Sequence, residues 1–340
     1  MRQPATPRSI LLALLLGAAP ASAVSIDWVT VGLPGAAADA QNGHGAVEYT
    51  YRISRYEVTN AQYAEFLNAV AVTADPNGLY NTEMASDPRG GIARSGSSGS
   101  YSYSSIAGRE LMPVNHVSFY DALRFANWLH NGQGMGAQDA TTTEDGAYTI
   151  TERGVAENSI LRNSGATIVL PDWDEWYKAA YHDALGVQAT NWFNYPTGTD
   201  TQTTCSGPTS ATNRANCEHA VGDATPVGSY PGSASPWGTL DQGGNVWEWS
   251  EAISSPGGAG REIRGGVYSG AATAMGSQFE LADFPSNETA IEGFRIVMLV
   301  PEPSTGLLVA LGLLELARRR RSPSRVRSAR RRRSRLPCEP

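Results

Sequence analysis

The chain has 340 residues, of which 41% are hydrophobic, so it is long enough for one large domain or two small ones with a packed core. The net charge of −7 hides an asymmetry, because residues 24–317 carry 13 basic and 32 acidic side chains while 11 arginines lie in residues 318–335. The acidic excess of residues 24–317 argues against nucleic acid as their partner, since binding phosphates requires a basic face.

Residues 1–23 have the pattern of a signal peptide. Arg2 and Arg8 provide the positive start, and residues 10–19 form an apolar stretch that is too short to span a bilayer as a mature helix. Ala23 ends a small-x-small cleavage site, so we expect export and a mature chain that begins at Val24. The alternative interpretation is a buried N-terminal helix.

Three helices are predicted by N-terminal capping boxes followed by apolar residues at helical spacing. The first covers residues 60–70, the second starts at residue 119 and stops at Asn131-Gly132, and the third starts at residue 173. The capping pairs are Thr59 with Gln62, Ser118 with Asp121, and Asp172 with Glu175.

Short strands are predicted between the helices, at residues 49–56, 167–170, 261–264 and 294–300. Residues 86–108 are rich in Ser, Gly and Tyr without a helical or strand period, and residues 197–222 are similar, so we expect two long surface insertions. Helices and strands follow one another without a βαβ rhythm, which favours an α+β fold over a parallel sheet.

The chain has three cysteines, Cys205, Cys217 and Cys338. An exported protein meets an oxidising compartment, so Cys205 and Cys217 are expected to close a short loop as a disulfide. Two free thiols in a surface insertion are the alternative.

The C-terminal region carries a second sorting pattern. Pro301, Glu302 and Pro303 precede an apolar run at 304–317 and four arginines at 318–321. This order resembles the PEP-CTERM signal of exopolysaccharide-producing Gram-negative bacteria, which implies that an exosortase cuts near the Pro-Glu-Pro after export.

The apolar run is shorter than the roughly 20 residues of a stable span, so residues 301–321 are expected to act as a transient inner-membrane anchor with the arginines on the cytoplasmic side. Residues 322–340 are expected to be a basic, disordered tail. Its alternative role as a nucleic-acid arm would place it across the membrane from the acidic body.

Seven short motifs occur between residues 50 and 298 in an order that is more specific than any one of them. They are Glu-Val-Thr-Asn at 57–60, Pro-Val-Asn-His-Val-Ser-Phe at 113–119, Leu-Pro-Asp-Trp-Asp-Glu-Trp at 170–176, Thr-Pro-Val-Gly at 225–228, Gly-Asn-Val-Trp-Glu-Trp at 244–249, Arg-Gly-Gly at 264–266 and Gly-Phe-Arg at 293–295. The ordered set resembles the formylglycine-generating enzyme (sulfatase-modifying factor) family. The resemblance implies a C-type-lectin-like, loop-rich α+β fold in a single domain over residues 24–300.

The resemblance also implies a structural calcium site at the turn of residues 244–249. Carried over residue by residue, its ligands are the side chains of Asp241 and Glu248 and the backbone carbonyls of Gly244 and Val246. Hard oxygen ligands with two anionic groups suit calcium. The alternative is that Asp241 and Glu248 only hydrogen-bond the turn.

Catalytic family members bind copper through two cysteines between Arg-Gly-Gly and Gly-Phe-Arg. Gly270 and Met275 occupy those positions here. Copper(I) binds tightly to two soft thiolates, whereas glycine has no side chain and one thioether cannot replace the pair. Copper is therefore not expected.

Two functions remain open. The first is an exported, non-catalytic module that binds exopolysaccharide or an envelope protein, with residues 86–108 and 267–290 as its recognition surface. It would be found in the periplasm, on the cell surface or outside the cell. The second is an oxidase that converts a cysteine of a client sulfatase to formylglycine, or another oxidoreductase activity of the family.

Overall fold

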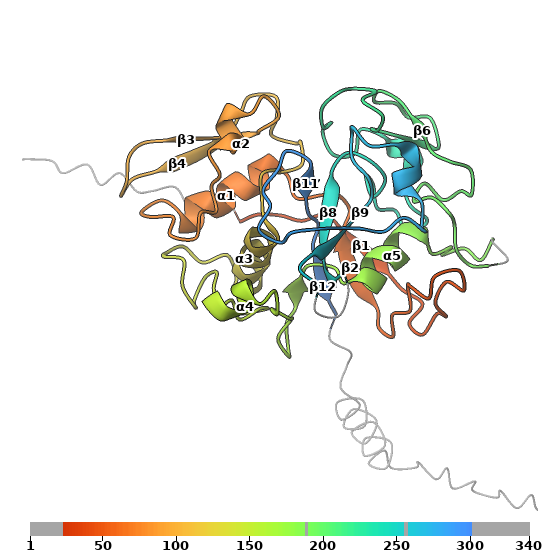
Figure 1. Cartoon of the computed structure of the whole chain (residues 1–340), viewed down its shortest axis with the longest axis horizontal. Coiled ribbons are helices and arrows are strands. Elements are labelled where there is room, and N and C mark those ends of the chain that lie inside the picture. The colour runs from red at the N-terminus through yellow and green to blue at the C-terminus, as the bar shows by residue number, and fades with distance from the viewer. Residues whose placement is uncertain (1–22, 188–189, 255–257, 301–340) are drawn as a thin grey trace, which may run out of the picture. The chain divides into compact units, whose positions relative to one another are not determined.

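Two four-stranded sheets and three longer helices make up the part of the chain that the structure, a computed structural model, describes: residues 23–187, 190–254 and 258–300 (Figure 1). This is the loop-rich α+β architecture that the sequence predicts. The signal peptide up to residue 22, the sorting signal at 301–321 and the tail at 322–340 lie outside the described residues. Within the described ranges, no helix is long and apolar enough to cross a membrane.

The first sheet joins the two ends of the domain. Its order is β1 (Trp28–Val31), β2 (Tyr51–Ser54), β12 (Val297–Leu299) and β5 (Ile168–Val169), and all neighbours are antiparallel. Val297 lies opposite Ile53 on one side and Val169 on the other, and all three side chains are buried. The last strand of the domain is thus an interior strand.

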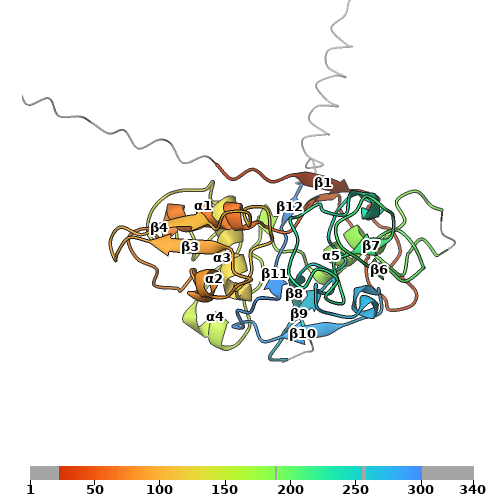
Figure 2. The same ribbon diagram turned by 90° about the horizontal axis from the view of Figure 1, so that it is seen from above.

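The second sheet carries the motif-rich part of the chain. Its order is β10 (Leu281–Asp283), β9 (Arg261–Arg264), β8 (Trp247–Ile253) and β11 (Glu292–Gly293), with β11 parallel to β8. Figure 2 shows β10 at the outer edge of this sheet. The strand at Arg261–Arg264 has the predicted bounds, whereas β8 and β1 were not predicted.

The three predicted helices are confirmed as α1 (Asn60–Val70), α3 (Phe119–His130) and α5 (Trp173–Tyr181). All three capping boxes are present, with each cap side chain accepting from the third helical amide and the partner side chain bonding back. These local bonds satisfy amides that would otherwise have no acceptor, which explains why the helix starts were predictable.

An aromatic cluster packs α1 against α3 and the second half of the chain. Phe125 lies 5.4 Å from both Phe66 and Phe294 between ring centroids, and 5.8 Å from Trp128. These rings are buried in the main core, and their tilted or edge-to-face contacts are the favoured geometry for aromatic pairs.

The prediction that residues 86–108 lack regular structure was wrong. Beyond the short helix α2 (Glu83–Ser86), strands β3 (Ile92–Ser95) and β4 (Ser102–Ser105) form an antiparallel hairpin that packs on α1. Ile92 and Tyr103 are buried, and the Asn68 side chain bonds both backbone groups of Tyr103. The remaining elements are α4 (Glu152–Ala156), the parallel pair β6 (Thr204–Cys205) and β7 (Arg214–Ala215), and the 3₁₀ turns η1 (Pro231–Ser233) and η2 (Ala272–Met275).

Candidate functional site

A fully buried ion pair joins Glu248, in the turn at residues 244–249, to Arg295. Arg295 Nε donates to Glu248 Oε2 at 2.5 Å, and Arg295 Nη2 donates to Glu248 Oε1 at 2.6 Å. The Trp176 indole N–H also donates to Glu248 Oε2 at 2.6 Å. Glu248 therefore joins β8, α5 and the Gly-Phe-Arg segment through charge-assisted bonds at the centre of the domain.

The turn itself requires glycine. Gly244 has a φ of +85°, and a Cβ at this position would lie 2.4 Å from the carbonyl oxygen of Asn216. Asn245 follows with a φ of +64°, and its side chain bonds Glu57 and Thr225. The left-handed backbone directs the chain sharply into β8.

Asp241 and Glu57 add two more carboxyl groups to this centre. Asp241 Oδ2 accepts from the Gly228 amide at 2.6 Å, and burial raises the pKa of Asp241 to about 6. Burial, with Asp241 and Glu248 nearby, raises the pKa of Glu57 well above its usual value, and Glu57 Oε2 has no hydrogen-bond partner. Three carboxyl groups thus surround the single guanidinium of Arg295.

Of the predicted calcium ligands, Gly244, Val246 and Glu248 lie on this turn and Asp241 shortly before it, but Glu248 is engaged by Arg295 and Trp176. Among the described residues, no three His, Cys, Asp or Glu side chains are grouped as a metal site. Three carboxyl groups, one of them with the unpartnered Glu57 Oε2, suit a bound cation. Both oxygens of Glu248 already accept hydrogen bonds from Arg295 or Trp176, which does not suit Glu248 as a cation ligand. The sequence motifs assign no role to Arg295 beyond its place in Gly-Phe-Arg.

Gly270 and Met275, the two positions predicted to correspond to the family's copper cysteines, have different structural roles. Gly270 lies in the loop before η2, where an added Cβ would lie 3.1 Å from Val267 Cγ1. Met275 is fully buried and packs with Ala215, Cys217 and Ala272. The residues present do not fit copper, because no thiolate lies at either position.

Cys205 and Cys217 are joined as a disulfide, with Cα atoms 5.0 Å apart. Cys217 is fully buried and contacts the Met275 cluster, whereas Cys205 is only partly buried. The disulfide therefore crosslinks two parts of the insertion at 197–222, and Cys217 packs this crosslink against Met275.

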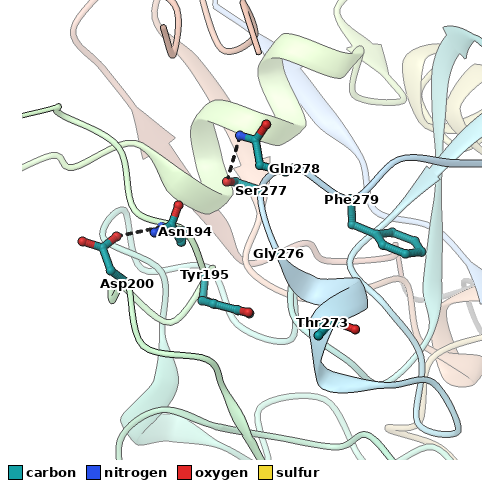
Figure 3. Close-up of a pocket in the computed structure, with 8 residues that line it drawn as sticks. All are labelled: Asn194, Tyr195, Asp200, Thr273, Gly276, Ser277, Gln278 and Phe279. Carbon is teal, nitrogen blue, oxygen red and sulfur yellow. Dashed lines mark hydrogen bonds between the residues drawn. The ribbon is translucent and has the colours of Figure 1, made fainter. Parts of the chain in front are cut away.

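A groove of about 420 Å³ opens beside Met275 (Figure 3). We call it the 194/279 groove. Two segments line it, and their lining residues are Asn194, Tyr195, Asp200, Thr273, Gly276, Ser277, Gln278 and Phe279. It falls in the size range of small-ligand sites.

The walls of the 194/279 groove are held by backbone and buried groups. The Ser277 amide donates to the Asn194 carbonyl at 2.9 Å and joins the two walls at their base. Arg264, the arginine of the Arg-Gly-Gly motif, donates to the carbonyls of Phe279 and Ser277. Phe279 stacks on Trp247 with ring centroids 5.8 Å apart.

The two segments predicted as a recognition surface differ in their role. The segment at 267–290 contributes Thr273, Gly276, Ser277, Gln278 and Phe279 to the groove, whereas the segment at 86–108 forms the β3–β4 hairpin on α1. The other wall, at 194–200, was not predicted, because its residues form no motif and meet the first wall only in the folded chain.

The antiparallel first sheet, the mixed second sheet and the glycine turn that leads into the buried Glu248–Arg295 pair define a sulfatase-modifying-factor fold. The chain belongs to the family described as sulfatase-modifying factor enzyme 1-like domain, whose model matches residues 32–300.

Solved structures resemble the domain at low sequence identity. CarF has a TM-score of 0.51 and 22% identity, over 82% of this chain and 99% of CarF. Variable protein 1 of Treponema denticola has a TM-score of 0.49 and 17% identity, over 80% and 94% of the two chains. PvdO from Pseudomonas aeruginosa has a TM-score of 0.42 and 16% identity, over 81% and 92%. No curated protein matches the chain.

Proposed function

We propose that this protein is an exported, non-catalytic member of the sulfatase-modifying factor family that binds a ligand of the cell envelope through the 194/279 groove. The observation that carries the proposal is which residues occupy the two positions predicted for the copper cysteines. One is a glycine, and the other is a methionine whose side chain is used in the core. Because neither position offers a thiolate for copper, binding is a better supported role for the 194/279 groove than oxidation.

Export is supported by the two ends of the sequence. The signal-peptide pattern at 1–23 and the PEP-CTERM-like pattern at 301–321 favour secretion followed by exosortase processing. The disulfide is in keeping with an oxidising compartment. We infer that the processed protein resides in the periplasm, on the cell surface or outside the cell, with exopolysaccharide or envelope proteins as its partners.

The proposal predicts that the exported protein does not oxidise a sulfatase-type cysteine peptide. The purified protein is incubated with copper(I), oxygen and the peptide, and mass spectrometry measures the conversion of cysteine to formylglycine. A catalytic member of the family serves as the positive control. Tight copper(I) binding together with aldehyde formation would overturn the proposed function.

We also propose that the acidic centre binds calcium through Asp241 and the carbonyls of Gly244 and Val246, while Glu248 stays paired with Arg295. Calcium at about 100 times its Kd is expected to raise the melting temperature by roughly 5 °C, because it binds the folded state only. Asp241→Asn, which keeps the shape of the side chain, should reduce this shift. An equal shift in wild type and variant, or none in the wild type, argues against the site.

A further inference from the structure

The lining of the 194/279 groove combines aromatic, amide, hydroxyl and carboxylate groups without a cation. Tyr195 and Phe279 are its aromatic residues, Asn194 and Gln278 supply amides, and Asp200 supplies a carboxylate. None of the described lining residues is lysine, arginine or histidine. Glu280 directly follows Phe279 outside the lining, and its Oε1 lies 3.7 Å from His44 Nε2.

The backbone of the groove walls is already hydrogen-bonded. The amides of Gly276, Ser277 and Phe279 donate to backbone carbonyls, and the carbonyls of Ser277 and Phe279 accept from Arg264. A peptide that binds by adding a strand needs open backbone donors and acceptors. Recognition in this groove therefore depends on side chains.

We infer that the 194/279 groove binds an uncharged sugar unit of a polysaccharide, an inference that rests on the binding role proposed above. Sugar rings present apolar C–H faces to aromatic rings and hydroxyl pairs to amides and carboxylates, which act as donors and acceptors together. Both kinds of group are among the lining residues, with Asn194, Tyr195 and Asp200 from one segment and Gln278 and Phe279 from the other (Figure 3).

Charge selects neutral sugars over acidic ones. A uronate or sulfate in the groove would meet the carboxylate of Asp200, with no lysine, arginine or histidine among the described lining residues, and like charges at close range repel. The acidic excess of residues 24–317 adds to this repulsion at longer range, most strongly at low ionic strength.

Phe279 and Gln278 are the side chains that test this inference. Phe279 is 37% exposed at the groove, and Phe284 is 59% exposed outside its lining, so Phe284→Ala is the matched control for removing an exposed aromatic ring. Gln278→Ala removes an exposed amide whose side-chain bond to Ser277 Oγ is long, at 3.4 Å. It therefore tests the groove without disturbing the stacking of Phe279 on Trp247.

The full-length protein is titrated by calorimetry with neutral oligosaccharides of glucose, galactose, mannose and N-acetylglucosamine, and with uronate oligosaccharides of equal length. At least one neutral oligosaccharide should bind, with the uronates weaker by roughly tenfold or more, which corresponds to about 1.4 kcal/mol. Phe279→Ala and Gln278→Ala should weaken binding of the neutral ligand about tenfold and a few-fold, respectively, while Phe284→Ala binds as the wild type does.

Equal or tighter binding of uronates, no binding of any neutral oligosaccharide, or binding that survives both groove variants would overturn the inference. Capture of an envelope peptide that Phe279→Ala abolishes, with no sugar bound, would overturn it in favour of a peptide ligand. These binding experiments do not measure oxidation of the peptide. Only formation of formylglycine contradicts the non-catalytic proposal, so the two proposals can fail independently.

Discussion

Glu248→Ala is expected to lower the free energy of unfolding by roughly 3–5 kcal/mol, because it leaves the fully buried guanidinium of Arg295 without its carboxylate. The Trp176 indole N–H loses its acceptor in the same change. Urea unfolding followed by tryptophan fluorescence measures the effect. Because the pair connects β8, α5 and the Gly-Phe-Arg segment, the loss should appear in the transition of the whole domain.

Glu57→Gln is the matched control for Glu248→Ala. It also removes a buried carboxyl group from the same centre, but one whose Oε2 has no hydrogen-bond partner. Replacing it with an amide of the same shape should change the stability by less than about 1 kcal/mol in either direction. A loss of similar size in both variants would mean that the Glu248–Arg295 pair has no special role.

Replacing both Cys205 and Cys217 with alanine is expected to lower the free energy of unfolding by about 2–4 kcal/mol. The bond closes a loop with a sequence separation of 12, and crosslinks of this size restrict the unfolded chain by about 3 kcal/mol. Loss of the buried sulfur of Cys217 beside Met275 adds a small cavity. Denaturant midpoints of the oxidised wild type and the double variant give the comparison.

The reduced wild type provides the control for the disulfide prediction, since it lacks the crosslink but keeps the side-chain volume. Its stability should approach that of the double variant and exceed it only by the cavity contribution. Met275 packs against Cys217, and Ser277, two residues further on, lines the groove. The double variant should therefore also bind a groove ligand more weakly. Equal stability of all three forms would contradict the prediction.

The helices were predictable because their signals are local. Each capping box places donor and acceptor three residues apart, so α1, α3 and α5 begin where the sequence predicts. The β3–β4 hairpin was missed because its residues are mostly serine, tyrosine and glycine, and only Ile92 and Tyr103 are fully buried in it. Its stability comes from packing on α1, which no local pattern reveals.

The candidate site was predictable in part. The motifs located the glycine turn, because it depends on residue types at fixed spacings, and they led to the predicted copper positions. They did not reveal that Arg295 takes both oxygens of Glu248, since the two are 47 residues apart. Likewise, Asn194 and Ser277 form one groove only through a tertiary hydrogen bond.

The interior position of β12 determines how late in folding the first sheet can form. Residues 297–299 fill the gap between β2 and β5, and their partner Ile53 lies near the start of the domain. The first sheet cannot form completely until residues 297–299 are available for pairing, and pairing between such distant segments is slow. Under the export proposed above, this late pairing would leave the chain unfolded for longer while it crosses the bilayer.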